Sequence, residues 1–285
     1  SWRIDTARFM TAVSNNPAVR LLIDTILKRQ NQLYINLYES VLEMTLDQID
    51  RVSILGPDKY IAKQFNNKIT QYKSLETIVP LAEHKVCEDF SCLSETTRKL
   101  RETWTDGIFI SGAYSAAGIN SAVTHDQEQV HKRFGATNDV YLISRFIPHE
   151  IDPTVLAVVA NENDVYIAGI ADQIIVGGNR FIGSKYPSIV SEAQRAELID
   201  YTIRVGRMLG GKGYRGIFGC DYLIAHDGSV YFLEINARKQ GTTLEFCFTL
   251  EQNLPEGSPM LPELEYYAVT ESRFPPHTVE MNGNI

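Results

Sequence analysis

Residues 213–243 decide the fold and read GYRGIFGCDYLIAHDGSVYFLEINARKQGTT. Asp227-Gly228, in the middle of this stretch, is a strong signal for a two-residue hairpin turn. Runs rich in β-forming residues flank the turn, at 220–225 and 230–236. The stretch therefore predicts a β-hairpin.

The expected turn also fixes which side chains face one another across the hairpin. With a two-residue loop, His226 pairs with Ser229. Counting back along both arms then sets Asp221 directly opposite Glu234. Because side chains alternate along a strand, Asn236 shares the face of Glu234.

Two carboxylates placed in this way need a cation between them. Opposed Cβ atoms in a hairpin lie roughly 5 Å apart, and like charges at that spacing are destabilising. Carboxylate oxygens with one amide carbonyl form a hard ligand set that suits Mg²⁺. Asp221, Glu234 and Asn236 therefore predict a magnesium site that also holds substrate phosphates. The alternative is a solvated hairpin face whose register is one step different.

Composition bounds the class of protein. The chain has 285 residues, ordinary hydrophobic and charged fractions and a net charge of −8, which favour a globular protein with a substantial core. The acidic balance argues against nucleic acid or an anionic membrane as a partner, and the apolar stretches are far short of a membrane span. No metal-binding or CxxC spacing occurs among the cysteines, so we expect reduced thiols and a cytoplasmic protein. The cysteines are Cys87, Cys92, Cys220 and Cys247.

The hairpin resembles the metal-binding end of the ATP-grasp superfamily, in which a strand carrying Asp is followed by a strand carrying Glu-x-Asn. The matching run is CDYLIAHDGSVYFLEINAR, residues 220–238. Members are mostly ligases that activate a carboxylate as an acyl phosphate. The resemblance implies that Asp221, Glu234 and Asn236 hold two Mg²⁺ ions, with Mn²⁺ as an alternative, against the phosphates of ATP. Arg238 fits the Glu-x-Asn-x-Arg form, in which the guanidinium faces the reacting carboxylate or its phosphate.

Residues 58–80 predict a helix with four lysines, Lys59, Lys63, Lys68 and Lys73. Four lysines on one helix commonly mark a solvated face. The segment LGPDKYIAKQFNNKITQYKSL nonetheless resembles the ATP-grasp helix that leads into the smaller lobe, where an Asp-Lys or Asn-Lys pair stands before the helix. By that resemblance Lys68 reaches the α- or β-phosphate as a point charge.

A strand expected at 107–111 leads into a loop of small residues, GAYSAAGINS, at 112–121. Small side chains allow the close backbone approach that an anion-binding nest of N–H groups needs. Such a loop can also be only a surface turn.

The resemblance extends to this loop with one departure. In the superfamily the strand ends in Lys-Pro and the loop folds over the phosphates, whereas Ser111 and Gly112 stand at those positions here. One of the usual phosphate-side lysines is therefore missing. The resemblance implies phosphate contacts from Ser115, Ala116 and Gly118.

Residues 139–147, DVYLISRFI, predict a strand that Pro148 ends. This strand matches the hinge between the two ATP-grasp lobes, whose backbone pairs with the adenine edge. The resemblance implies an adenine site at Ser144, Arg145, Phe146 and Ile147. It also implies that Glu150 binds the ribose hydroxyls, although an exposed loop acid is an equally good interpretation of Glu150.

Two strands at 154–159 and 165–170 predict a second hairpin. The following segment, ADQIIVGGNRFIGSKYP, contains Lys185. In several ligases of the superfamily a lysine at this place reaches the transferring phosphoryl group. By that resemblance Lys185 is the γ-phosphate lysine, with Arg180 near it in sequence. A helix at 191–209 then leads to the hairpin that carries the metal residues.

Two other nucleotide-binding motifs are excluded. Residues 211–216 satisfy the GxGxxG pattern, but the dinucleotide fingerprint follows a strand and opens a helix, whereas this one follows a helix and opens a strand. No GxxxxGK[ST] occurs in the sequence, which excludes a P-loop NTPase.

The predicted fold class is α+β: an ATP-grasp fold with two α+β lobes whose antiparallel sheets hold ATP between them. An N-terminal segment at 1–57 is expected to be helical and to end in a short strand. The smaller lobe, with the phosphate loop, is expected at 58–147, and the larger lobe, with the metal site, at 148–285. A final strand is expected at 266–270.

The function that the resemblance implies is an ATP-dependent ligase, which activates a carboxylate as an acyl phosphate, joins it to an amine and releases ADP and phosphate. The expected partners are small-molecule substrates, an amino acid or a peptide, with a thiol or carrier protein as an alternative acceptor and a homodimer as an open option. Lys68 and Lys185 would offset phosphate charge. A phosphotransferase of the same fold is one alternative. An ATP-binding module without catalysis is another, motivated by Ser111.

Overall fold

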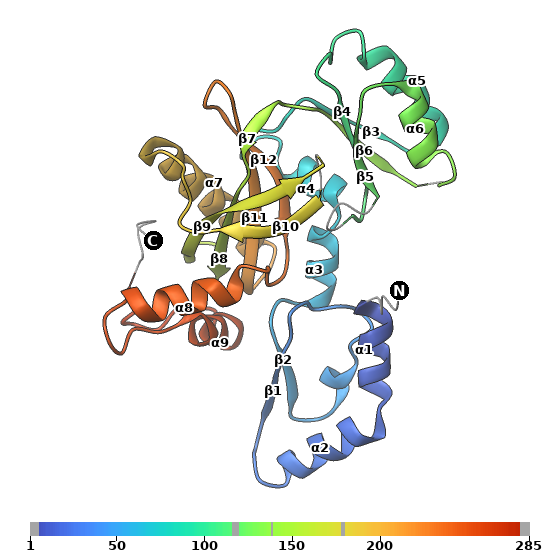
Figure 1. Ribbon diagram of the computed structural model, residues 1–285. Helices are drawn as coiled ribbons and strands as arrows, with labels where there is room; N and C mark the ends of the chain where they lie inside the picture. The colour runs from blue at the N-terminus through green and yellow to red at the C-terminus, as the bar shows by residue number, and fades with distance from the viewer. Residues whose placement is uncertain (1–5, 116–119, 138, 178–179, 280–285) are drawn as a thin grey trace.

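The computed structural model describes residues 6–115, 120–137, 139–177 and 180–279. The described chain is α+β and builds sheets of two, four and six strands. Figure 1 shows the N-terminal segment at one end, with the helix α3 (Lys59–Phe65) running from it toward the two lobes that hold the larger sheets. Each of the three expected domain ranges contains one sheet, and the domain boundaries themselves stay a prediction.

The N-terminal segment packs two helices against a two-stranded parallel sheet. Its elements are α1 (Thr6–Asn15), α2 (Pro17–Leu27), β1 (Leu33–Asn36), the 3₁₀ helix η1 (Leu46–Gln48) and β2 (Val52–Leu55). Asn16 caps α2, because its side chain accepts a hydrogen bond from the Ala18 N–H at 2.8 Å. The strand expected at the end of this segment is β2, and β1 was not predicted.

The helix expected at 58–80 is wrong as a single element, because the structure divides it into α3 and α4 (Lys68–Leu75). Asp58 caps the first helix and Asn67 caps the second, accepting from the N–H groups of Ile69 and Thr70 at 3.0 and 3.1 Å. Asn side chains compete with the helical backbone for hydrogen bonds, so the Asn66-Asn67 pair ends one helix and starts the next.

The smaller lobe is a four-stranded antiparallel sheet covered by two helices. Its elements are β3 (His84–Cys87), α5 (Phe90–Leu100), β4 (Ile108–Gly112), β5 (Ser121–Thr124), α6 (Gln127–Phe134) and β6 (Tyr141–Arg145), in the strand order β3-β6-β4-β5. Apolar side chains from α5, α6 and the sheet form one core, which includes Leu93, Val130 and Ile143. The opposite face of this sheet is left for the cavity described below.

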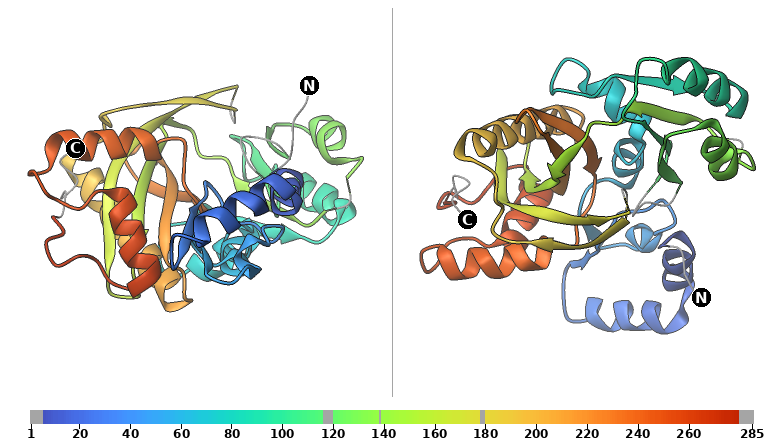
Figure 2. Two further views of the ribbon diagram at one scale, coloured as in Figure 1. Left: turned by 90° about the horizontal axis from the view of Figure 1, so that it is seen from below. Right: turned by 45° about the horizontal axis from the view of Figure 1, so that its top comes forward.

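The larger lobe is a six-stranded antiparallel sheet with helices on both faces. Its elements are β7 (His149–Ile151), β8 (Pro153–Val159), β9 (Val165–Val176), β10 (Arg180–Lys185), α7 (Glu192–Gly211), β11 (Gly216–Ala225), β12 (Val230–Asn236), α8 (Thr243–Asn253) and α9 (Leu261–Glu271). The strands run in the order β10-β9-β8-β11-β12, and β7 pairs with β11. Figures 1 and 2 show α7 on one side of the sheet and α8 with α9 on the other.

The central strand β8 is buried on both faces. Val155, Ala157 and Val159 pack with α7, whereas Leu156 and Val158 pack with α8 and α9. This alternation explains why 153–159 is apolar without a break. The rigid sheet that results carries β11, and with it the acidic residues of the predicted hairpin.

The predicted hairpin is confirmed, but its loop has three residues instead of two. The Ala225 N–H donates to the Ser229 carbonyl at 2.9 Å, so His226, Asp227 and Gly228 form the loop, with Gly228 at φ +87°. This loop shifts the pairing by one step near the turn.

A bulge restores the predicted pairing farther from the turn. Tyr222 pairs with Phe232, and the next pair is Asp221 with Glu234, which leaves Leu233 as the extra residue. Asp221 and Glu234 therefore face each other as expected, because the longer loop and the bulge shift the pairing in opposite directions.

The strand expected at 266–270 is wrong, since these residues lie within α9. Tyr, Val and Thr favour strands locally, but Leu261, Leu264 and Ala268 are fully buried at helical spacing against β8 and β11. Packing of this face outweighs the local preference. Within the described ranges, no helix combines the length and the apolar character that crossing a membrane takes.

Candidate functional site

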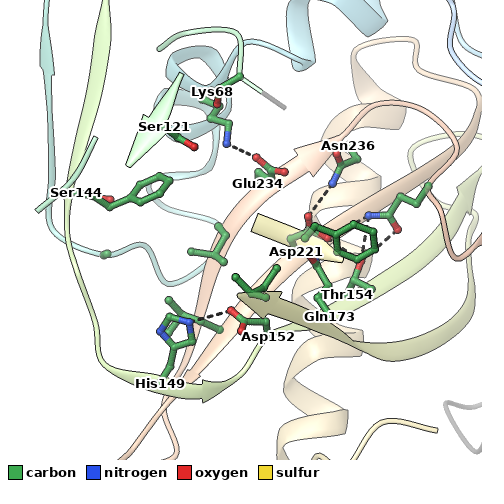
Figure 3. A pocket seen from close by; sticks show the side chains of 18 of the residues that line it. Lys68, Ser121, Ser144, His149, Asp152, Thr154, Gln173, Asp221, Glu234 and Asn236 are labelled. Atoms are coloured by element: carbon green, nitrogen blue, oxygen red, sulfur yellow. Dashed lines mark hydrogen bonds and ion pairs between the residues drawn. The ribbon is translucent and has the colours of Figure 1, made fainter. Parts of the chain in front are cut away.

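A cavity of about 360 Å³ lies between the two larger sheets and the N-terminal segment. Figure 3 shows how side chains from both lobes point into it. The polar residues that line it include Tyr38, Lys68, Ser115, Ser121, Ser144, His149, Asp152, Thr154, Gln173, Asp221, Glu234, Asn236, Arg238, Gln240 and Thr242. The cavity thus collects most of the residues that the sequence singled out.

Asp221 stands at the centre of a buried hydrogen-bond network. It is only 8% exposed, and the sheet places it between Thr154 on β8 and Glu234 on β12. The Thr154 hydroxyl and the Gln240 amide donate to Oδ1 at 2.7 and 3.1 Å. The Asn236 amide donates to Oδ2 at 2.9 Å. The position and orientation of this carboxylate are therefore fixed from three sides.

Burial raises the pKa of Asp221 to about 6, and the charge of Glu234 adds to the rise. The hydrogen bonds from Thr154 and Asn236 act in the opposite direction but do not cancel it. The charged form of Asp221 is therefore disfavoured unless a cation lies near it. This is the condition that a divalent metal would meet.

Lys68 supplies the one positive side chain that pairs with these carboxylates among the described residues. Its Nζ forms an ion pair with Oε2 of Glu234, as Figure 3 shows. Lys68 is the first residue of α4, and its backbone N–H donates to the Ala113 carbonyl at 2.9 Å. The same residue thus ties the start of the small-residue loop to the acidic end of the cavity.

The donor set fits a hard divalent cation with external ligands. Among the described residues no group of three or more His, Cys, Asp and Glu side chains is placed to hold a metal by itself. Two carboxylates and one amide, from Asp221, Glu234 and Asn236, line the same cavity. Mg²⁺ is usually held by one or two carboxylates together with substrate phosphates and water, so the residues present suit that ion.

The four residues predicted to bind adenine belong to the lining of the cavity. They are Ser144, Arg145, Phe146 and Ile147. Apolar side chains near them, Ile175, Phe181, Leu223 and Leu233, complete walls that could hold a flat ring.

Glu150 does not line the cavity, so its expected contact with ribose is not supported. Its side chain is 82% exposed, with one oxygen 3.8 Å from Nδ1 of His226. Successive side chains on β7 point to opposite sides, and the neighbouring His149 lines the cavity instead. Glu150 is an exposed acid, as the alternative interpretation expects, but it lies on the strand β7 and not in a loop.

His149 and Asp152 also line the cavity, and neither was predicted from the sequence. His149 Nε2 lies 2.9 Å from Asp152 Oδ1, and its Nδ1 donates to the Ile147 carbonyl at 2.6 Å. Burial alone lowers the pKa of His149, but the hydrogen bonds to Asp152 and Ile147 outweigh it and raise the pKa above its usual value. His-x-x-Asp next to the hinge was the signal that could have indicated them.

Lys185 lies outside the cavity in this structure. It is exposed, whereas its neighbours on β10, Ser184 and Phe181, line the cavity. Lys185 pairs in register with Asp172 at the end of the β9–β10 hairpin that is far from its turn. Arg180 is also exposed. The side chain alternation of an edge strand therefore turns the predicted γ-phosphate lysine away.

The small-residue loop is described only in part. Ser115 lines the cavity, and its buried Oγ has no hydrogen-bond partner among the described residues. Ala116 and Gly118 lie outside the described residues. Ser111 is fully buried, and its cross-strand neighbours Ser121 and Leu142 line the cavity. The position where the usual lysine is missing therefore faces the site.

Arg238 lines the cavity next to the acidic residues. Its Nη2 donates to the Asn236 Oδ1 at 2.9 Å, and its Nη1 donates to the Lys239 carbonyl at 2.9 Å and to the Tyr38 hydroxyl at 3.2 Å. Tyr38 comes from the N-terminal segment, 200 residues away. Nothing in the local sequence of Tyr38 indicated this contact.

Comparison with known proteins points to one family. A family model described as the ATP-grasp domain matches residues 65–242. A carboxyaminoimidazole ribonucleotide synthase from Aspergillus clavatus, solved with ATP, superposes with a TM-score of 0.68 at 16% identity and covers 94% of this chain and 66% of its own. At that identity the superposition shows the fold alone.

Two curated proteins are similar over part of the chain. A [butirosin acyl-carrier protein]–L-glutamate ligase from Niallia circulans is 21% identical over 208 residues, 70% of this chain and 49% of the relative. An L-propargylglycine–L-glutamate ligase from Streptantibioticus cattleyicolor is 32% identical over 101 residues, 35% of this chain and 20% of the relative. The match thus spans about half the length of the first relative and a fifth of the second.

Proposed function

Because the chain belongs to the ATP-grasp family, we propose that it is an ATP-dependent ligase that joins a carboxylate to an amine. The observation that carries the proposal is the pairing of Asp221 with Glu234 on one face of the hairpin, where both line a cavity between two antiparallel sheets. Lys68 and Arg238 line the same cavity, and they supply positive charge for anionic groups.

We assign the metal site to Asp221, Glu234 and Asn236. Mg²⁺ held there, with Mn²⁺ as an alternative, would offset the charge of the β- and γ-phosphates. The raised pKa of Asp221 supports this assignment, because the burial and the neighbouring carboxylate that cause it are costs that a cation relieves. We assign Lys68 to the phosphates as well, in exchange for its present partner Glu234.

We assign the other end of the cavity to the nucleotide base. The hinge residues 144–147 offer backbone groups at the cavity edge, and Ile175 and Leu223 offer apolar walls. We assign the ribose to His149 and Asp152 in place of Glu150, because both line the cavity and follow residues 144–147 closely in the chain.

The proposed reaction has two steps. A carboxylate oxygen of the acid attacks the γ-phosphorus, and the bond from that phosphorus to the bridging oxygen of ADP breaks. The amine nitrogen then attacks the acyl carbon, phosphate leaves with the electron pair of the broken C–O bond, and the nitrogen loses a proton to solvent. The chain contributes mainly positioning and electrostatic stabilisation, with Arg238 next to the reacting carboxylate.

The proposed substrates are small molecules, an amino acid or peptide among them. Both curated relatives carry names of ligases that act with L-glutamate, so L-glutamate is the first compound to test. The name of the first relative also includes an acyl-carrier protein, so a carrier thiol is the alternative acceptor. Four free cysteines agree with a reducing compartment such as the cytoplasm.

A second candidate function is an ATP-binding module without catalysis. Ser111 favours it, because its position faces the site and lacks the positive charge usual there. A phosphotransferase differs from both, since it would release ADP with an acid alone and leave a phosphorylated product.

The test is ADP release by the full chain with Mg²⁺, ATP and amino acids, singly and in pairs, starting with L-glutamate. The ligase predicts ADP that needs both an acid and an amine, together with an amide product in the mass spectrum. Asp221→Asn should abolish turnover, and Glu150→Gln, at an exposed position, is the matched control. Mg²⁺-dependent ATP binding without ADP under every pairing would contradict the ligase and favour the module.

A further inference from the structure

Lys239, which follows Arg238 directly, forms a buried ion pair with Glu265, and neither Lys239 nor Glu265 lines the cavity. The Nζ of Lys239 lies 2.8 and 2.7 Å from the two carboxylate oxygens of Glu265. The side chains are 15% and 1% exposed. The same Nζ donates to the Leu37 carbonyl at 3.0 Å. One ammonium group therefore joins α9 of the larger lobe to the N-terminal segment.

The larger lobe fixes the position of Glu265. This residue lies on α9, which packs on β8 and β11. Burial raises the pKa of Glu265, while the charge and hydrogen bond of Lys239 and a hydrogen bond from the backbone of Ile217 on β11 act against the rise. The next residue, Tyr266, packs edge to face on Tyr34 of β1, with 5.3 Å between the ring centroids. α9 therefore contacts the N-terminal segment directly at Tyr266, and Glu265 reaches it through Lys239.

An ion pair is not the arrangement that stability alone favours at a buried position. The cost of removing two charges from water offsets much or all of their attraction, and an apolar pair of similar volume is often as stable or more so. A lysine paired with a glutamate adds direction, because the carboxylate fixes the position of the ammonium, which has three N–H donors and can serve a further acceptor. In this structure the further acceptor is the Leu37 carbonyl.

The loop of Leu37 and Tyr38 connects this ion pair to Arg238. The backbone N–H of Lys239 donates to the Tyr38 carbonyl at 3.1 Å, so Lys239 holds the loop with its backbone and with its side chain. The Tyr38 hydroxyl accepts from Nη1 of Arg238 at 3.2 Å, and Cζ of Arg238 lies 5.6 Å from the centroid of the Tyr38 ring. Release of the Leu37 carbonyl would therefore loosen the ring that holds the guanidinium.

We propose that Lys239 and Glu265 are positioning residues for Arg238, which act by fixing the loop of Leu37 and Tyr38 against its guanidinium. Both lie outside the lining of the cavity, so they act through Arg238 and not on a substrate. The inference rests on the proposed function for the role of Arg238 itself, and it adds the residues that orient this side chain. A contact made by α9 thus sets the geometry inside the cavity.

The experiment measures the reactivity of Arg238, so it does not depend on turnover. The full chain is treated with phenylglyoxal, an arginine-selective reagent, and peptide mass spectrometry follows the rate at which Arg238 is modified. Lys239→Met should raise this rate about tenfold, because a charged hydrogen bond that holds the loop is lost. Arg204, which is exposed on α7, should react at the wild-type rate in every variant.

A double variant separates positioning from a loss of stability. Lys239→Met leaves the buried Glu265 without its partner and should lower the free energy of unfolding. Adding Glu265→Leu removes both charges, so stability should return close to the wild-type value. The modification of Arg238 should stay fast in the double variant, because the Leu37 carbonyl still lacks its donor. A purely structural role would restore the rate together with the stability.

Lys59→Met is the matched control for Lys239→Met. The Lys59 side chain is also 15% exposed, and its Nζ donates to a carboxylate oxygen of Asp47 at 2.7 Å and to the Met44 carbonyl at 2.8 Å. None of these three residues lines the cavity. Lys59→Met should therefore lower the free energy of unfolding and leave the modification rate of Arg238 at the wild-type value.

Tyr38→Ala tests the path from the ion pair to Arg238. It removes the ring and the hydroxyl, so it should raise the modification rate of Arg238 as Lys239→Met does. The two changes together should have no more effect than the larger one alone, because both act through the same contact. Rates that multiply in the combined variant would show that Lys239 acts on Arg238 by another route, and the proposal would be wrong.

The outcomes separate this inference from the proposed function. If Lys239→Met leaves the rate at Arg238 unchanged, or if adding Glu265→Leu restores it, the inference is wrong even when ADP release shows a ligase. If the rates change as expected but no acid and amine release ADP, the positioning is right and the ligase function is wrong. In an active ligase the double variant should raise the KM for the acid and leave the KM for ATP unchanged.

Discussion

Lys68, at the start of α4, forms an ion pair with Glu234 of β12, and both side chains line the cavity between the lobes. The contact joins the loop at Ala113 to the hairpin that carries the acidic residues. Lys68→Met removes the positive charge of Lys68, so Glu234 and Asp221 face each other without a cationic partner. We expect the KM for ATP to rise about tenfold or more, since a charged hydrogen bond is lost. Steady-state kinetics over a range of ATP concentrations measure this.

Lys73→Met is the matched control for Lys68→Met, because Lys73 is exposed on the same helix. It should leave the KM for ATP at the wild-type value. Equal KM values for the two variants would contradict the assignment of Lys68 to the phosphates.

If Mg²⁺ binds at Asp221 as proposed, its binding should depend on pH. Its pKa in the folded protein is raised to about 6 from an ordinary value of 3.8. The sign follows from that direction: the charged form is disfavoured in the folded protein, so this group lowers stability as the pH rises from its ordinary value through about 6. A bound cation offsets this loss, and protons compete with the cation at lower pH.

We therefore expect Mg²⁺ to raise the melting temperature more at about pH 8 than at about pH 5. Differential scanning fluorimetry of the full chain, with and without Mg²⁺ and ADP, checks this. In Asp221→Asn the Mg²⁺ effect should be small at both pH values. An equal Mg²⁺ effect in this variant and the wild type would show that the ion binds elsewhere.

His149 should contribute stability on the acidic side of neutrality. Its pKa is raised in the folded protein by the hydrogen bonds to Asp152 and Ile147, which outweigh burial. The contribution is therefore fully present below the ordinary pKa of histidine, about 6.5, and is lost as the pH rises through the raised value. The wild type should exceed His149→Gln in melting temperature by more at about pH 5.5 than at about pH 8.5.

His277→Gln is the control for His149→Gln, because His277 is exposed. The difference in melting temperature between His277→Gln and the wild type should be the same at the two pH values. A His149→Gln difference that is constant with pH would mean that the ion pair with Asp152 is not formed in solution.

The sequence predicted the hairpin and the facing pair of carboxylates, but through two errors that cancel. Asp227-Gly228 predicts a two-residue loop, whereas the loop holds three residues and the bulge at Leu233 compensates. Turn propensity is local, but a bulge depends on how the strand packs against its neighbours. The pairing of Asp221 with Glu234 could therefore be predicted from the sequence. The three-residue loop and the bulge that produce this pairing could not.

The remaining misses have a common cause, which is contact between residues far apart in the chain. Tyr38 reaches Arg238 from the N-terminal segment, and Thr154 bonds Asp221 from the neighbouring strand β8. Neither contact can be recognised from a pattern in the sequence around the residues that form it. Glu150 and Lys185 were placed by their order along the chain, and the alternation of side chains on β7 and β10 turned both away from the cavity.

A substitution at Gly219 tests the buried hydrogen-bond network around Asp221. A Cβ at this position would lie 2.0 Å from Cδ of Gln240, whose Nε2 donates to Asp221 at 3.1 Å. Gly219→Ala must therefore push the Gln240 side chain away and remove one donor from the buried carboxylate. We expect the free energy of unfolding to fall by about 1–3 kcal/mol. Chemical denaturation measures it.

A double-mutant cycle separates this effect from a general intolerance of alanine at Gly219. In Gln240→Ala the side chain that collides is gone, so adding Gly219→Ala should cost clearly less than it does in the wild type. Gly211→Ala is the matched control, because nothing lies within 4 Å of a Cβ at that position. Additive costs in the cycle would show that Gln240 does not fill the space above Gly219, and the network that orients Asp221 would then have to be redrawn.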